Sequence, residues 1–129
     1  MDVNQLNGVA LAYLGDSAYE LKIRQYVLEQ GIRQASQLHR ASVQYVEAKA
    51  QAKVIQYWLH VSDCLSDEEI NIYKRGRNHK ANTKAKNASI GEYRQATGFE
   101  ALMGWLYLSQ RYDRFNQLVE DAIQIIEGE

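Results

Sequence analysis

Apolar residues along this chain recur at the spacing of an α-helix rather than of a strand. In the first segment the helical spacing is kept by Leu6, Ala10, Tyr13, Leu14, Ala18 and Leu21. The side chain of Asn4 or Asn7 can cap the start of a helix, and Gly31 suits the position after its end. No segment rich in Val, Ile and Thr alternates apolar with polar positions. The pattern predicts an all-α fold with a long first helix.

Further helices are predicted downstream. A short helix is expected around residues 35–40 and a longer one over about 42–58, with an inner face made by Val43, Val46, Ala50, Val54 and Tyr57. Asp113 can cap a final helix that runs through Ile126. Proline is absent, so nothing in the composition interrupts these helices.

Two capping boxes mark the starts of two more helices. Ser66 is followed by Glu69 and Ser89 by Glu92, the spacing at which the two side chains satisfy each other's backbone N–H groups. The first predicts a helix that ends near Gly76, and the second starts the helix that carries Glu100.

Two isolated carboxylates stand out against this pattern. Asp16 is the only charged residue in the segment 3–19, and Glu100 is the only one in the segment 95–110. A segment that is apolar on nearly every face of a helix belongs in a core, where an ionised carboxylate is costly unless it is paired. If the two meet, either their proton affinities rise or a divalent cation lies between them.

Gly8 and Gly15 weaken the first helix by about 1 kcal/mol each relative to alanine. This cost is understandable if another backbone packs closely at those positions. Both glycines are therefore predicted to be helix contact points.

The chain has 129 residues, which fits one domain over 1–129. A single cysteine excludes an internal disulfide and a Cys-rich zinc site. No charge-free apolar run approaches the ~20 residues needed to span a membrane, and no secretory leader is recognisable. Composition thus predicts a cytoplasmic protein without a membrane partner.

Positive charge is concentrated in one segment. The formal net charge is only −1, yet residues 74–86 hold six bases and no acid. Glycine and asparagine favour a loop over residues 74–87, and such a charge pattern suggests a polyanionic partner. The candidate residues for binding such a polyanion are Lys74, Arg75, Arg77, Asn78, Lys80, Lys84 and Lys86.

Three motifs together resemble the catalytic domain of the ribonuclease III family. They are Leu14-Gly15-Asp16, Arg75-Gly76-Arg77-Asn78 and the segment from Phe99 to Gly104. The resemblance covers the whole chain in the same order. Because no double-stranded-RNA-binding module is expected after this domain, the chain is most similar to the small bacterial branch, Mini-ribonuclease III.

The resemblance implies a helical homodimer whose cleft holds double-stranded RNA, each site cutting one strand. Asp16 and Glu100 match the family's central metal ligands, for Mg²⁺ or Mn²⁺, and Tyr13 matches an aromatic residue at the dimer interface. The implied products carry 5′-phosphate and 3′-hydroxyl ends. The small branch also implies maturation of precursor large-subunit (23S) ribosomal RNA, a step of ribosome biogenesis.

The chain departs from the larger enzymes at two positions. These enzymes have a glutamate four residues before the aspartate and an aspartate three residues before the glutamate, where this chain has Ala12 and Thr97. Glu20, one helical turn after Asp16, is a candidate replacement or supporting ligand.

Three other interpretations remain open from the sequence. The carboxylates can form structural salt bridges, for instance with Arg94 or Lys22. The chain can be a non-catalytic RNA-binding or ribosome-assembly protein that keeps the fold and the basic segment. It can also be a dimeric adaptor that binds other proteins.

Overall fold

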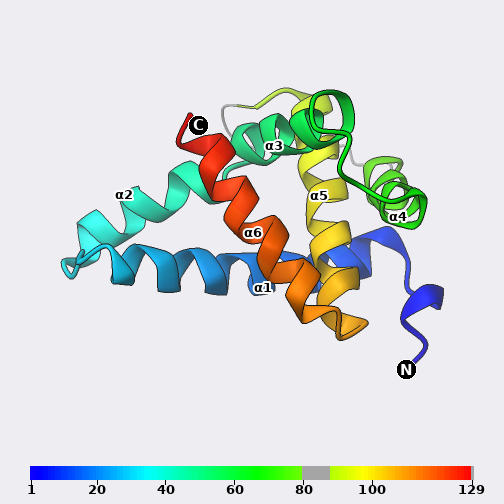
Figure 1. Ribbon diagram of the computed structural model, residues 1–129, viewed down its shortest axis with the longest axis horizontal. Helices are drawn as coiled ribbons and strands as arrows, with labels where there is room; N and C mark the ends of the chain where they lie inside the picture. Colours follow the sequence, from blue (N-terminus) through cyan, green and yellow to red (C-terminus); the bar gives the residue numbers. More distant parts are fainter. Residues whose placement is uncertain (80–87, 129) are drawn as a thin grey trace.

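The computed structural model describes residues 1–79 and 88–128, and this part of the chain is helical without strands (Figure 1). A 3₁₀ turn at Val3–Gln5 precedes six α-helices. Their bounds are α1 Gly8–Glu29, α2 Ala35–Val46, α3 Ala48–His60, α4 Asp67–Arg77, α5 Ile90–Leu108 and α6 Tyr112–Ile126. The predicted all-α class is confirmed. No described helix is both long and apolar enough to cross a membrane.

The predicted caps form. The Asn7 side chain accepts a hydrogen bond from the Ala10 backbone N–H at 2.8 Å, so α1 begins at the second of the two predicted positions. Both capping boxes are complete, with reciprocal bonds between side chain and backbone at the starts of α4 and α5. Local side-chain chemistry therefore sets where these three helices begin.

Two predicted helix boundaries are wrong. The break expected near residue 41 lies at Glu47, whose ψ of 153° is extended and separates α2 from α3. The predicted inner face of α3 is wrong at one position, since Tyr57 is 37% exposed and its neighbour Trp58 is buried. The second wrong boundary differs little from the prediction, since α6 begins at Tyr112 and Asp113 lies in its first turn instead of capping it.

Helix α5 lies at the centre of the molecule and contacts α1, α3, α4 and α6 (Figure 1). Its Phe99 meets Tyr19 of α1 edge-on at 4.9 Å and stacks on Trp58 of α3 at 5.6 Å, both measured between ring centroids. The Trp58 indole N–H donates to Asp121 of α6 at 2.7 Å. This aromatic cluster ties four helices together beside the carboxylate positions.

Helices α1 and α5 cross at very close range. A Cβ atom at Gly15 would overlap the Glu100 carbonyl oxygen, and one at Gly104 would overlap the Leu11 carbonyl oxygen. Gly8 likewise lies against the backbone of Arg75. The prediction that Gly8 and Gly15 are contact points is confirmed. The close crossing of α1 and α5 at Gly15 and Gly104 sets the distance between the neighbouring residues of the two helices.

Candidate active site

The α1–α5 crossing brings Asp16 and Glu100 together. Gly15 contacts the Glu100 backbone directly, so the next side chain of α1 emerges beside that of Glu100. The Asp16 charge acts on the Glu100 carboxyl, as expected for neighbouring carboxylates. Two carboxyl groups that are 84 residues apart in sequence thus form one acidic pair.

Burial, followed by the neighbouring Asp16 and then the charge of Glu20, raises the pKa of Glu100 to about 9. A carboxyl with this pKa holds its proton at neutral pH. A divalent cation between the two groups would reverse the preference, because it favours the ionised form of both.

Neither member of the pair has a basic partner in the part of the chain that the structure describes. The ion pairs there join Glu20 with Arg24, Glu68 with Arg111, and Glu69 with Arg114. A structural salt bridge to Arg94 or Lys22 is therefore not formed. The donor set fits a hard cation such as Mg²⁺, which is often bound through one or two carboxylates and retains water ligands.

Glu20 lies near the pair but is already engaged. It is half-buried and forms an ion pair with Arg24, one turn further along α1. Among the described residues no group of three His, Cys, Asp or Glu side chains is placed to hold a metal. The geometry thus supplies two carboxylates, and Glu20 as a ligand stays a prediction.

Asp16 differs from the expectation of a buried residue. It is exposed in the single chain, because α1 packs one side on α5 and leaves the other side open. The open side also carries apolar residues: Tyr13 is 81% exposed, and Val9 and Leu21 are exposed as well. The carboxylate is therefore accessible to a phosphate, next to an uncovered apolar surface.

The two positions at which this chain differs from the larger enzymes, Ala12 and Thr97, offer no carboxylate that could bind a metal ion. Ala12 is buried and has no polar side chain. Thr97 is half-buried, and its hydroxyl donates to the Tyr93 carbonyl oxygen at 3.1 Å. Neither position replaces a carboxylate.

One neighbour of Glu100 was missed in the sequence. Gln51 of α3 is 1% exposed, and its side chain lies close enough to Glu100 to lower the pKa of that carboxyl. Nothing in the sequence separates this glutamine from the others in the chain, because only the tertiary packing turns it inward.

The basic residues that the structure describes lie on α4 rather than in a loop. Lys74, Arg75 and Arg77 occupy its last turn, and the helix ends at Arg77 with Asn78 as its C-terminal cap. Positive side chains at a helix C-terminus also complement its dipole. Lys80, Lys84 and Lys86 lie outside the described residues.

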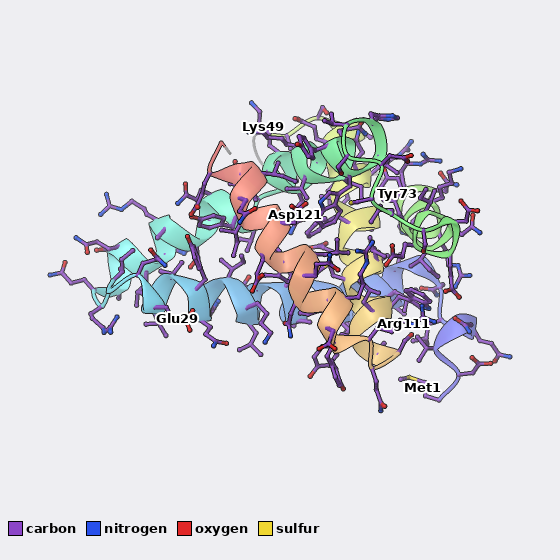
Figure 2. All side chains as sticks on the ribbon, in the orientation of Figure 1. Met1, Glu29, Lys49, Tyr73, Arg111 and Asp121 are labelled. Carbon is purple, nitrogen blue, oxygen red and sulfur yellow. The ribbon has the colours of Figure 1, made fainter. Side chains whose placement is uncertain are left out.

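These basic side chains differ in what they contact. Arg75 donates to the backbone carbonyl oxygens of Asn4 and Leu6, at 3.2 Å each, and so holds the chain that enters α1. Arg77 lies over the ring of Tyr73, which Figure 2 labels on α4, and donates to the Asn78 side chain. Lys74 is exposed and makes no hydrogen bond or ion pair among the described residues.

The chain matches the model of the Ribonuclease III domain over residues 9–111. It is 44% identical to a Mini-ribonuclease 3 of Streptococcus pneumoniae over 99% of both chains. It is 49% identical to the Mini-ribonuclease 3 of Enterococcus faecalis over 95% of this chain and 92% of that relative. A crystal structure of a protein from Fusobacterium nucleatum is similar with a TM-score of 0.83 and 30% identity, covering 95% of this chain and 96% of that one.

Proposed function

Because this chain belongs to the ribonuclease III family, we propose that it cuts double-stranded RNA at a divalent metal ion held by Asp16 and Glu100. The family and the relatives identify the chain as an endoribonuclease. The site assignment rests mainly on one observation, the pairing of these two carboxylates at the α1–α5 crossing without a basic partner in the described residues. We take residues 1–129 as a single catalytic domain.

The two carboxylates have different parts in this proposal. Glu100 lies deeper and anchors the cation, whereas Asp16 is exposed and lies where an RNA phosphate can approach. When bound, Mg²⁺ or Mn²⁺ activates the attacking water and stabilises the charge on the leaving 3′ oxygen. The expected ends are a 5′-phosphate and a 3′-hydroxyl.

Metal affinity is expected to be weak in the absence of RNA. Two protein carboxylates leave most of the coordination shell to water and to RNA phosphate, since Ala12 and Thr97 supply no further carboxylate. Calorimetry that shows tight Mg²⁺ binding to the free protein would contradict this expectation.

RNA contact is assigned to the basic end of α4 and to the segment after it. Lys74 and Arg77 present positive charge at the end of this helix, with Asn78 as its C-terminal cap. Lysine and arginine contacts to phosphates give affinity that falls with salt and carry little sequence information. Duplex shape, rather than base identity, is then the feature that these residues recognise.

A second copy of the chain is the proposed cover for the open face of α1. This face exposes Val9, Tyr13 and Leu21 at helical spacing. A surface hollow beside it is lined by Tyr13, Gly8 and Arg75, and so adjoins the basic end of α4. An isologous dimer through α1 would place two acidic pairs on one assembly, as cutting both strands requires.

The natural substrate that we propose is precursor 23S ribosomal RNA. This rests on the similarity to relatives named Mini-ribonuclease 3, since no residue described above reads a particular stem. A matched pair of substrates tests it: a structured ribosomal precursor and an unrelated duplex of equal length.

The central test is incubation of the protein with a long RNA duplex in Mg²⁺, in Mn²⁺ and in chelator. Asp16→Asn and Glu100→Gln should abolish metal-dependent cutting while the protein stays folded. Asp113→Asn and Glu68→Gln make the same chemical changes at exposed sites and should cut normally. Salt-sensitive duplex binding by the intact protein with no cutting, on either substrate, would favour the non-catalytic RNA-binding alternative.

A further inference from the structure

Gln51 is an anomaly in the packing of α3. It is 1% exposed, and its side-chain Nε2 is buried without a hydrogen-bond partner in the part of the chain that the structure describes. A buried donor without a partner is destabilising, so native structures rarely retain one. Gln56, on the same helix, shows the usual outcome, since its Nε2 donates to Gln95 at 2.8 Å.

The position of Gln51 on α3 directs it toward the acidic pair. Figure 2 shows Lys49 at the outer edge of α3, and a residue two positions further along a helix faces the opposite side. On this inner side Gln51 lies beside Glu100. Its side chain is close to the Glu100 carboxyl, but its Nε2 makes no completed hydrogen bond to that group. The unused donor therefore adjoins the less exposed of the two carboxyl groups of the site.

We propose that Gln51 is a positioning residue that donates its Nε2–H to the Glu100 carboxylate when that group binds the metal ion. The inference rests on the proposed function, because it takes Glu100 as a metal ligand. The donor has no partner among the residues that the structure describes and would gain one in the loaded site. Carboxylates that bind metals are commonly held in this way by a second hydrogen bond.

A neutral amide suits this task better than a basic side chain would. Arginine or lysine beside Glu100 would cancel the negative charge that attracts the cation, whereas an amide orients one oxygen and leaves the charge in place. Orientation matters more in this chain than in the larger enzymes. With Ala12 and Thr97 in place of carboxylates, fewer protein ligands hold the ion.

The test compares Gln51→Met with Gln56→Met. Methionine matches glutamine in length and removes only the amide, and Gln56 is the control on the same helix, away from the acidic pair. Mn²⁺ binding to the free protein is measured from the electron-spin resonance of the unbound ion, which follows weak binding. Thermal unfolding of the metal-free proteins is measured alongside, and Gln51→Leu repeats the test with a second apolar side chain.

Gln51→Met should weaken Mn²⁺ binding by about 10-fold to 100-fold. Its metal-free unfolding temperature should equal or exceed that of the wild type, because an unsatisfied buried donor has been removed. The Mn²⁺ concentration that half-saturates cleavage should rise by a similar factor. Gln56→Met should leave both Mn²⁺ measurements unchanged.

Unchanged Mn²⁺ binding in Gln51→Met, with or without a loss of thermal stability, would overturn the positioning role and leave Gln51 as a packing residue. A wild-type protein that binds no Mn²⁺ at any concentration and does not respond to metals in cleavage would instead overturn the proposed metal site itself. The two failures are therefore distinguishable in one experiment.

Discussion

Gly15 of α1 lies against Glu100 of α5 so closely that no side chain fits between the two backbones. The same contact is made in the other direction, because Gly104 of α5 lies against the backbone of Leu11. Two glycines on opposite sides of one crossing therefore fix the distance between the helices. The spacing of Asp16 and Glu100 depends on that distance.

Gly15→Ala should destabilise the protein and separate the acidic pair. The added Cβ atom overlaps the Glu100 carbonyl oxygen, which belongs to the backbone and cannot turn aside. Overpacking of this kind costs about 1–3 kcal/mol, or more where backbones must move. Urea unfolding measures the loss, and metal-dependent cleavage should fall below what the remaining folded fraction explains.

Gly91→Ala is the matched control for this change. Gly91 lies in the first turn of α5, where a Cβ atom would meet only the Ser89 side chain at 3.8 Å. Replacing an unstrained helical glycine stabilises by about 0.4–1 kcal/mol, chiefly through the unfolded chain. Equal and small effects of the two substitutions would show that the crossing is looser than described.

Local signals in the sequence were sufficient for much of the fold. Asn7, Ser66 and Ser89 each start a helix through bonds that their own side chains make, so their positions could be predicted. The break between α2 and α3 at Glu47 could not be predicted in this way. No glycine or proline marks it, and its extended backbone follows from how α2 and α3 pack, which a local pattern does not contain.

The candidate site was predictable in part for a similar reason. Asp16 and Glu100 stood out because charge is rare in the segments around them, and Gly15 because a helix-interior glycine is costly. Gln51 carried no such signal, since glutamine is common on exposed helix faces in this chain. The exposure of Asp16 also escaped prediction, because a run of apolar residues does not show which side of the helix stays open.

The buried ion pair between α4 and α6 gives a prediction about stability and pH. Glu69 is 4% exposed, and Arg114 donates to both of its carboxylate oxygens at 2.8 Å. Burial alone would raise the pKa of Glu69, but hydrogen bonds from Arg114 and Ser66 outweigh it and lower that pKa below its ordinary value. Arg114→Met should therefore cost about 3–5 kcal/mol at neutral pH.

The pH dependence distinguishes this pair from ordinary packing. In the wild type the stabilisation is present above the ordinary carboxyl pKa and is lost as pH falls through the lowered one. In Arg114→Met no guanidinium opposes the effect of burial, which raises the pKa of Glu69. Protonation of Glu69 should therefore restore stability as pH falls from 7 toward 4. Urea unfolding across that range should show the two proteins converging. Glu68→Gln, at an exposed ion pair with Arg111, should change stability by less than about 1 kcal/mol.

Two neighbouring bases on α4 should differ in effect. Lys74→Ala should weaken duplex binding and reduce the steepness of the plot of log affinity against log salt by about 1, because one phosphate contact is lost. Its stability should be unchanged. Arg75→Ala should lower stability as well, since its guanidinium holds the carbonyl oxygens of Asn4 and Leu6. Binding titrations at several salt concentrations, with thermal unfolding, separate the two. Equal stability losses would contradict the assignment.

The open face of α1 gives the prediction with the largest expected effect. Tyr13 is the most exposed aromatic residue on that face, at 81%, with Leu21 at 62% two turns further along. A large aromatic side chain at the centre of an interface typically contributes 2 kcal/mol or more. An isologous dimer contains each contact twice, so Tyr13→Ser should raise the dimer dissociation constant by about 1,000-fold.

Light scattering over a range of protein concentrations measures this change directly. Tyr57→Ser removes an exposed aromatic residue from α3, on a different face of the molecule, and should leave the dimer intact. Because each protomer has its own acidic pair, a monomeric Tyr13→Ser protein should keep its Mn²⁺ affinity while losing coordinated cutting of both strands. A wild-type protein that is monomeric throughout would refute the dimer, and α1 would then expose its apolar face for contact with RNA or another protein.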